Sequence, residues 1–282
     1  MKVDLTGAPE TMLATLYARA LDARAARPVL GDTAALEAVG RIEYDFGRTG
    51  INAGTAAGVA MRAKLLDGWT RDFLAAHPSA TVLHLACGLD TRARRVAFGE
   101  GVRWVDVELP EVAALRERLL PPPPGDYRLV HASVTSAGWL DEVPADRPVV
   151  VVAEGLTMYL TEEDVRGLVR RVVDRFTGGE LLFDAYGSFG IRLQGFVPAV
   201  RRAGAVLRWG LDDPAVVEAW APGLTCVDAL RSVELPDIAL MPASARVPLR
   251  VMARLPGFRD AGRVLRFRFQ ADRSGARPSD GA

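Results

Sequence analysis

The chain has 282 residues, of which 49% are hydrophobic and 25% are charged. These proportions are those of a soluble globular protein and exclude wholesale disorder. Thirty-five basic residues balance thirty-five acidic ones, so the chain lacks the basic surplus expected of a nucleic-acid-binding protein.

The sequence also disfavours a secreted, membrane-bound or metal-binding protein. Cys87 and Cys226 match no disulfide or metal-ligand spacing. Residues 1–9 contain no signal-peptide pattern, and no apolar run approaches the ~20 residues of a membrane span. We therefore expect a cytoplasmic protein without a metal site.

The first eighty residues are expected to be helical and to form a lid. Apolar residues recur at helical spacing over 13–20 and over 55–76, with a loop over 44–52 between them. From Thr81 the period changes, because 81–86 is a short, largely apolar run of the kind that forms a strand buried on both faces of a parallel sheet. Further strands are expected at 102–107, 127–131, 149–153 and 180–185, and helices between them at 91–98, 111–120 and 161–176.

This alternation predicts an α/β fold with right-handed crossovers and a doubly wound, mostly parallel sheet of seven strands. The last two strands are expected at 224–227 and 263–269, with a helix over 243–254 between them. Residues 187–222 break the rhythm and are expected to be a helical insertion that caps the same domain. We predict one domain over residues 1–270 and a disordered tail over 271–282.

Polar residues gather where the predicted strands end, and sheets of this kind bind ligands at the carboxyl ends of their strands. Gly88, after the first strand, lets the backbone approach a ligand closely. Asp106 and Glu108 follow it by 18 and 20 residues, about the ~20-residue spacing at which nucleotide-binding units place an acid against ribose hydroxyls. The other polar residues at strand ends are Cys87, Asp90, His131, Ser133, Glu154, Tyr159, Asp184 and Tyr186.

A full G-x-G-x-x-G triplet is absent, because Ala86 stands two residues before Gly88. Pyrophosphate binding depends on that triplet and on the helix N-terminus behind it, which disfavours NAD and a nucleotide-dependent oxidoreductase. S-adenosylmethionine (SAM) is an adenosine compound without phosphates, so its binding does not require the glycine triplet. A methyltransferase is the preferred interpretation. The alternatives are a non-catalytic protein that binds SAM or S-adenosylhomocysteine, and a methyltransferase fold recruited for another reaction.

Four stretches of the chain then occur in a recognisable order. They are residues 61–64 (MRAK), 85–92 (LACGLDTR), 105–112 (VDVELPEV) and 153–160 (AEGLTMYL), the last followed by a Thr-x-Glu helix start. Together, over roughly residues 10–186, they resemble the leucine carboxyl methyltransferase family, and within it the bacterial polyketide O-methyltransferases of the tetracenomycin type. The resemblance implies a class I SAM-dependent methyltransferase.

The resemblance implies contacts for the methionine part of SAM. Arg62 would pair with its carboxylate, a bidentate task that suits arginine. The Ala86–Gly88 turn, which includes Cys87, would pass beside the methionine portion, and Glu154 would face the amino group with Tyr159 nearby. Asp90 and Arg92 complete this set, although Asp90 is equally well explained as a cap for the helix that starts at Thr91.

The adenosine part has its own expected contacts. Glu108, with Asp106 as a second candidate, would hold the ribose hydroxyls, and Ser133 and Val134 would flank the adenine. Two positions depart from the family pattern. Ala86 replaces the usual first glycine, and Ser133 stands where some members have an aspartate, and both positions belong to the expected cofactor contacts.

Methyl transfer would be a direct displacement for which the enzyme mainly aligns nucleophile, methyl and sulfur. A carboxylate acceptor is ionised at neutral pH and needs no base, whereas a phenol (pKa about 10) benefits from one. His131 and Tyr159 are the expected catalytic residues. The expected partner is a small-molecule methyl acceptor of a polyketide-like kind, with no nucleic acid and no membrane. The oligomeric state is left open between a monomer and a homo-oligomer.

Overall fold

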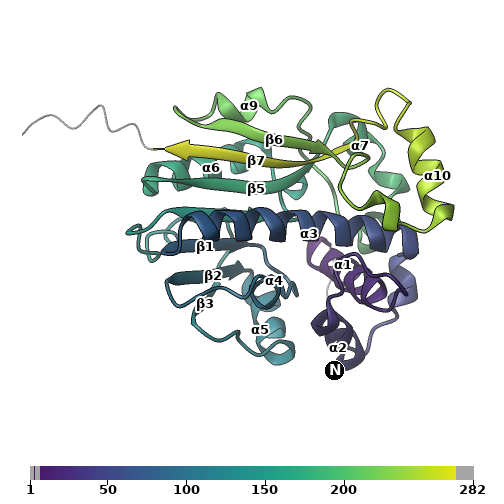
Figure 1. Cartoon of the computed structure of the whole chain (residues 1–282), viewed down its shortest axis with the longest axis horizontal. Coiled ribbons are helices and arrows are strands. Elements are labelled where there is room, and N and C mark those ends of the chain that lie inside the picture. Colours follow the sequence, from purple (N-terminus) through teal and green to yellow (C-terminus); the bar gives the residue numbers. More distant parts are fainter. Residues whose placement is uncertain (1–2, 4–6, 271–282) are drawn as a thin grey trace, which may run out of the picture.

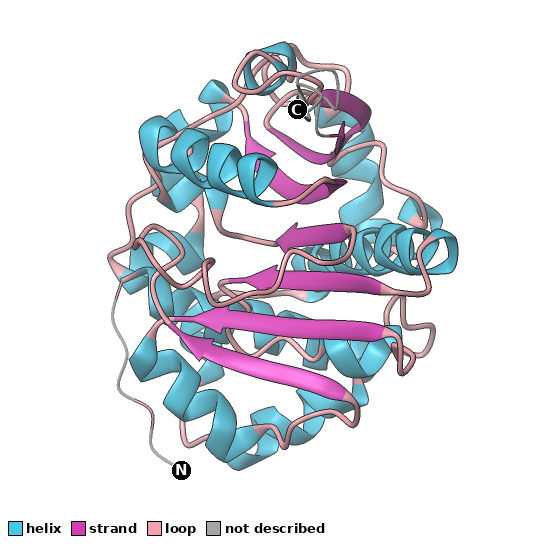
Figure 2. Cartoon of the chain, turned by 90° about the vertical axis from the view of Figure 1, so that its left-hand side faces the viewer, coloured by secondary structure: helices cyan, strands magenta, loops and turns pink. Residues whose placement is uncertain are grey.

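The computed structural model describes residue 3 and residues 7–270, and a seven-stranded sheet runs through it (Figure 2). The strand order is β3-β2-β1-β4-β5-β7-β6. β7 pairs antiparallel with both β5 and β6, and the other pairs of neighbouring strands are parallel. The predicted α/β fold with a mostly parallel sheet is confirmed. The strands are β1 (Ala80–Leu85), β2 (Val102–Glu108), β3 (Asp126–His131), β4 (Val149–Ala153), β5 (Gly178–Tyr186), β6 (Thr225–Arg231) and β7 (Gly262–Gln270).

The valines of β4 explain why this strand lies at the centre of the sheet. All five of its residues are buried. Val149 and Val151 belong to the core on one face, beneath α6 (Glu162–Arg175), and Val150 and Val152 belong to the core on the other, beneath α3 (Ala53–Ala76). Each buried valine contributes roughly 1.5–3 kcal/mol, so a strand apolar on both faces is stable only between two layers of helices.

A group of helices lies beyond the carboxyl ends of β1–β3, in the lower right part of Figure 1. It comprises α1 (Ala8–Ala23), α2 (Thr33–Arg41) and the short helix η1 (Phe46–Thr49), which we call the lid. α1 packs against α2, α3 and α8 (Pro198–Ala203), and the N–H of Gly7 donates to the Ala203 carbonyl at 2.8 Å. Of the residues expected to form a lid, those of α3 instead run along the sheet.

The stretch over residues 187–222 consists of short helices rather than long ones. They are α7 (Ser188–Arg192), η3 (Gln194–Phe196), α8 and α9 (Ala215–Glu218). Pro198 begins α8 and Gly204, in the left-handed region at φ 66°, ends it, so glycine and proline divide a stretch whose composition indicated a helix.

The remaining helices connect and flank the strands. No helix among residues 7–270 is long and apolar enough to cross a bilayer. The predicted tail, 271–282, lies outside the described residues. The helices that connect and flank the strands are α4 (Arg92–Val96), α5 (Pro110–Leu119), η2 (Thr157–Tyr159), η4 (Ile238–Leu240) and α10 (Ala243–Met252).

Candidate active site

A cavity of about 520 Å³ lies between the lid and the carboxyl ends of the strands. Its floor includes 86–90 after β1, Glu108 at the end of β2, 132–134 after β3 and 154–156 after β4. The strand order reverses between β1 and β4, and ligands of open α/β sheets bind at such a switch point. The volume falls in the range of about 300–1,000 Å³ that is usual for small-molecule sites.

The turn after β1 presents its backbone to this cavity. Ala86 and Gly88 have φ of 48° and 49°, a region that non-glycine residues rarely adopt. A Cβ on Gly88 would lie 3.3 Å from the Cβ of Met12 in α1, so glycine allows the lid to approach. Cys87 also borders the cavity, but burial raises the pKa of its thiol, which excludes a thiolate nucleophile at neutral pH.

Glu108 combines burial with unused acceptor capacity. Its Oε2 accepts from the Gly88 N–H at 2.6 Å and its Oε1 from the Leu109 N–H at 2.7 Å. A carboxylate offers about four lone-pair positions, so each oxygen retains one for a ligand hydroxyl. Burial raises the pKa of Glu108 despite the two backbone donors.

Asp106, the second candidate for the ribose, lies away from the cavity lining. It is completely buried, pairs with Arg116 at 2.7 Å and accepts from Trp104 at 2.8 Å and Tyr127 at 2.8 Å. Burial raises the pKa of Asp106, but Arg116 and His84 outweigh it and keep the carboxyl ionised. Of the two acids, the structure brings only Glu108 to the site.

Arg62 borders the cavity but is already bonded to two carboxylates. Its Nη1 lies 2.7 Å from Asp184 Oδ2, and its Nη2 lies 2.9 Å from Glu154 Oε1, with Nε 3.1 Å from the same oxygen. A guanidinium has five N–H donors, so two remain. Burial raises the pKa of Glu154, but Arg62 and Arg92 overcome this and hold it at about 2.

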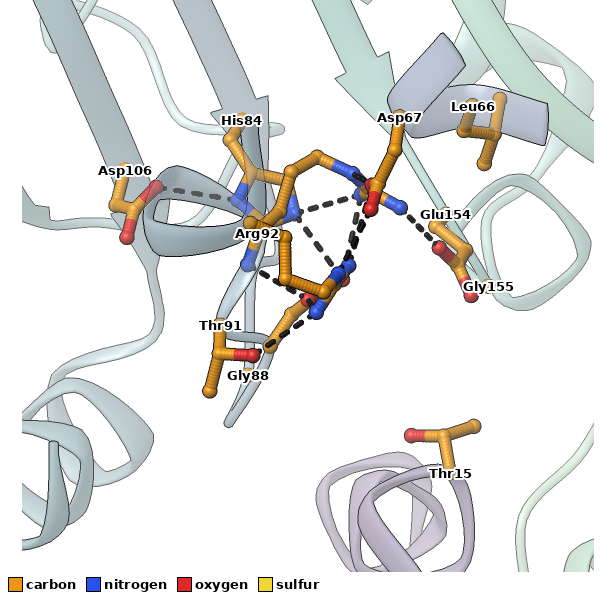
Figure 3. A network of polar contacts seen from close by, with 12 residues as sticks. Thr15, Leu66, Asp67, His84, Gly88, Thr91, Arg92, Asp106, Glu154 and Gly155 are labelled. Atoms are coloured by element: carbon orange, nitrogen blue, oxygen red, sulfur yellow. Dashed lines mark hydrogen bonds and ion pairs between the residues drawn. The ribbon is translucent and has the colours of Figure 1, made fainter. Parts of the chain in front are cut away.

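Arg92 acts beneath the cavity and does not line it. The side chain is fully buried, and its Nε lies 2.7 Å from Asp67 Oδ1. It also bonds Glu154 and His84 (Figure 3). Arg92 therefore fixes Glu154 from below, in place of the direct contact with the cofactor that the sequence suggested.

Asp90 lines the cavity as a member of an ion-pair cluster. Its Oδ1 accepts from the Arg92 N–H at 2.9 Å and from Arg95 Nη1 at 2.8 Å. Burial raises the pKa of Asp90, and Arg19 and Arg95 reverse that effect so that it lies well below its usual range. Asp90 therefore accepts from the first backbone N–H of α4, whose N-cap residue is Thr91, and it also faces the cavity.

The two expected catalytic residues are placed very differently. His131 ends β3 at the edge of the sheet, 39% of its side chain is exposed, and its Nε2 lies 3.3 Å from Glu117 Oε1. His131 does not line the cavity, so the structure does not support its suggested role as a catalytic base. Tyr159 does line it and donates to Thr11 Oγ1 at 3.2 Å. Burial raises the pKa of Tyr159, which makes it a hydrogen-bond donor rather than a base at neutral pH.

Ser133 and Val134, which the sequence analysis expects to flank the adenine, line the cavity in the part of the wall that follows β3. Sequence reasoning did not identify the contribution of α1. Thr11, Thr15 and Arg19 recur every four residues, which places them on one helix face, and all three line the cavity. This repeat of polar residues, on a helix that also has an apolar core face, is the sequence signal that indicates the contribution of α1.

Comparison with known proteins places this site in a family. A leucine carboxyl methyltransferase model matches residues 12–173. The tetracenomycin polyketide synthesis O-methyltransferase TcmP of Streptomyces glaucescens is 44% identical over 95% of this chain and 98% of its own length. The S-adenosyl-L-methionine-dependent methyltransferase dpfgK of Gibberella zeae is 41% identical over 79% of this chain and 82% of its own.

Two crystal structures share the fold at low sequence identity. One is a protein described as a methyltransferase, from Thermobifida fusca YX, with a TM-score of 0.56 and 19% identity over 90% of this chain and 94% of that one. The other is a DUF574 family protein of Streptomyces avermitilis, with a TM-score of 0.56 and 17% identity over 90% and 97%. The sequence-based predictions of family, methyltransferase class and SAM as cofactor are confirmed by the matches. The chain therefore belongs to the leucine carboxyl methyltransferase family.

Proposed function

We propose that this protein is a cytoplasmic SAM-dependent O-methyltransferase that acts on a carboxylate or hydroxyl of a small, polyketide-like molecule. The observation that supports it best is the position of Glu108. Its buried carboxylate lines the cavity beside Gly88 and keeps one acceptor position on each oxygen, which matches the two adjacent hydroxyls of a ribose.

The charges around the cavity suit a sulfonium compound. Among the lining residues, the carboxyl groups of Asp90, Glu108 and Glu154 outnumber the guanidiniums of Arg19 and Arg62. In a site of low dielectric, such an excess of negative charge favours a cationic ligand. When bound, SAM supplies an electrophilic methyl group on a sulfonium leaving group, so the chain needs to position the acceptor rather than activate the donor.

The wall formed by α8 and η2 is suited to an apolar acceptor. The polar atoms in this region include the hydroxyls of Tyr159, in η2, and of Tyr186, at the adjoining end of β5, and burial raises the pKa of both. Tyr186 can therefore donate a hydrogen bond to an acceptor oxygen, whereas the Tyr159 proton is already donated to Thr11. Neither tyrosine withdraws the proton of the acceptor at neutral pH. The apolar residues of this part are Met158, Leu160, Val197, Pro198 and Val200.

This arrangement favours an acceptor that is ionised without help, which means a carboxylate or an acidic phenol. The test is transfer of an isotope-labelled methyl group from SAM to a panel of aromatic carboxylic acids and phenols between pH 6 and 9. A rate that stays flat over this range identifies a carboxylate, and a rising rate identifies a phenol whose proton must be lost. SAM binding without transfer to any member of the panel would favour the non-catalytic alternative.

A further inference from the structure

The outer side of α10 carries a concentration of exposed apolar side chains. Four of the eight large apolar side chains that are exposed among the described residues lie within positions 247–255. Val247 is 58% exposed, Val251 55% and Leu255 46%. These three recur every four residues, so they follow one face of the helix and of the turn after it. The fourth is Met252. Exposed apolar patches rimmed by polar residues mark interaction sites.

The opposite side of α10 is buried against the rest of the protein. Ala245 and Leu249 pack against the core that lies beneath α3, and a Cβ on Gly54 of α3 would lie 2.5 Å from the Cβ of Ala245. α10 is therefore anchored through its inner side, and the apolar residues of its outer side are free to contact another molecule.

The charge of this segment has one sign. Residues 238–259 contain four arginines and no acidic residue, although basic and acidic residues are equal in number over the whole chain. Arg259 lies 3.6 Å from Asp260, whereas Arg250 and Arg254 are exposed and have no acidic partner among the described residues. Arg250 and Arg254 lie four positions apart, in the helical row beside the apolar one. We call these two arginines, together with the four exposed apolar residues, the α10 face.

We propose that the α10 face docks an acidic protein that presents an amphipathic helix. Helices are recognised through apolar anchors three or four positions apart, which is the spacing of the apolar row on α10. A guanidinium bonds a carboxylate through two parallel N–H groups. A partner helix with apolar residues in one row and carboxylates in the next complements both features of the α10 face.

Two other occupants are disfavoured by the same charges. A symmetric pair of copies of this chain would place the arginines of both α10 faces together, and residues 238–259 offer no acid to pair with them. An anionic membrane surface is recognised by clusters of about 4–8 basic residues, whereas the α10 face presents two arginines. Both features favour an acidic protein as the occupant.

The α10 face lies near the cavity. Ala245 meets α3 at Gly54, and the cavity lining includes Asn52 and Thr55, on either side of Gly54. Figure 1 shows α10 at the end of α3 where that helix begins. Asn52 is exposed, so a protein bound to α10 lies next to an exposed part of the cavity wall.

The test uses three fluorescein-labelled synthetic peptides, each about four helical turns long, and measures their binding to the full chain by fluorescence anisotropy. The first peptide carries leucine at every fourth position and glutamate in the adjoining row. The second has lysine in place of glutamate, and the third is a scramble of the first. The first should bind at least about tenfold more tightly than the second, because like charges repel across an interface. The scramble should also bind more weakly, since it lacks the apolar row.

Two variants of the α10 face examine its two features separately. Val247→Ser/Val251→Ser should weaken the acidic peptide by about tenfold or more, the effect expected of residues at the centre of an interface. Arg250→Glu/Arg254→Glu should reverse the preference, so that the lysine peptide binds more tightly than the acidic one. All four positions are exposed, so both variants are expected to keep the thermal unfolding midpoint of the wild type.

Val216→Ser/Val227→Ser is the matched control. Both valines are 42% exposed and lie outside the α10 face. This variant removes the same amount of apolar side chain from the surface and should leave all three affinities unchanged. A loss equal to that of the α10 variant would show that the peptides bind without a specific site.

The proposal is overturned if the acidic and lysine peptides bind alike, if neither binds, or if the charge-reversed variant keeps the wild-type preference. Two further measurements identify the other occupants. Binding to phosphatidylserine vesicles that is lost in Val247→Ser/Val251→Ser would assign the α10 face to a membrane. A dimer that sedimentation detects in the wild type and not in this variant would assign it to a second copy of the chain. Either of these results would also overturn the proposal.

Discussion

Arg62 and Glu154 lie 92 positions apart in the sequence, yet Arg62 Nη2 is 2.9 Å from Glu154 Oε1. This contact joins α3 to the end of β4. Arg92 bonds the other carboxylate oxygen from below, so Glu154 is fixed between two guanidiniums. The shape of the cavity at the switch point thus depends on a buried carboxylate that touches three elements.

Glu154→Gln should destabilise the fold. Removing one partner of a buried ion pair leaves uncompensated charge, at a cost of about 3–5 kcal/mol. Urea denaturation measures the free energy of unfolding. Glu142→Gln is the control, because Glu142 pairs with Arg128 on the exposed surface and such pairs contribute about 1 kcal/mol or less. Equal losses of unfolding free energy in the two variants would contradict a stabilising role for the buried ion pairs of Glu154.

The depressed pKa of Glu154 gives a pH signature. Its pKa falls from 4.5 to about 2 on folding, so the carboxylate stabilises the protein above pH 4.5, and this contribution is lost as the pH falls from 4.5 towards 2. Thermal unfolding of the wild type between pH 5 and 2 should show a loss that is smaller in Glu154→Gln. Parallel curves for the two proteins would contradict the assignment.

Substitutions at Gly88 and Ala86, in the turn after β1, should change the free energy of unfolding in opposite directions. Gly88→Ala introduces a Cβ into left-handed backbone against Met12. It should lower the free energy of unfolding by about 1–2 kcal/mol and weaken the binding of SAM. Ala86→Gly relieves the same strain at φ 48° and should be neutral or stabilising. The control is Gly68→Ala, in the middle of α3 with open space around it, which should stabilise by about 0.5–1 kcal/mol. A stable Gly88→Ala protein would show that the lid does not require this close approach.

Glu108 and Asp106 should separate cofactor binding from folding. Glu108→Gln should weaken SAM by about tenfold or more, because a charged acceptor for hydroxyls is lost. It should cost less stability than Asp106→Asn, although its amide nitrogen replaces the acceptor of one backbone N–H. Asp106→Asn should lower the free energy of unfolding through its contact with Arg116 and leave the affinity of the folded protein nearly unchanged. Calorimetry and urea denaturation on both variants test this division, and the reverse outcome would assign the ribose to Asp106.

The raised pKa of Glu108 predicts how affinity depends on acidity. The carboxylate must be ionised to accept two hydroxyls, and burial raises its pKa above 4.5. Affinity for SAM should therefore fall as the pH is lowered towards and through that pKa, and the Glu108→Gln variant should lack this fall. An identical pH profile in the variant would assign the titration to another group.

The catalytic expectation for His131 can be tested separately. His131→Ala should leave kcat unchanged, because the side chain lies outside the cavity lining. Tyr159→Phe removes a hydroxyl from the cavity and should lower kcat by about tenfold, the usual effect of one lost hydrogen bond. Initial rates with a common acceptor decide the matter. A large loss in His131→Ala with an unchanged fold would restore it as a catalytic residue.

Much of the fold follows from local sequence, and the place of Glu108 beside Gly88 follows from strand register. The valines of β4 predict a strand covered on both faces. Spacing alone linked Gly88 to both Asp106 and Glu108. Glu108 lies beside Gly88 because β1 and β2 pair in parallel with Leu85 opposite Val107, so that their ends coincide. The helix α2 was not identified, although Asp32 accepts from the Ala35 N–H as its N-cap, a pattern visible in the sequence.

Other parts of the site depend on long-range geometry. His131 looked suitable because it ends a strand, but strand order, which puts β3 at the sheet edge, is not encoded locally. The contacts of Arg62 are made to Glu154, after β4, and to Asp184, at the end of β5. The ion pairs of Arg19 are made to Asp32 and Asp90, which come from separate segments of the chain.

The most direct test of the account is a crystal structure of the protein grown with S-adenosylhomocysteine. The account predicts that the nucleoside lies between the lid and the ends of β1, β2 and β4, with both ribose hydroxyls on Glu108 and the adenine between Ser133 and Val134. A ligand bound elsewhere, or a ribose held by other groups in the same cavity, would contradict it.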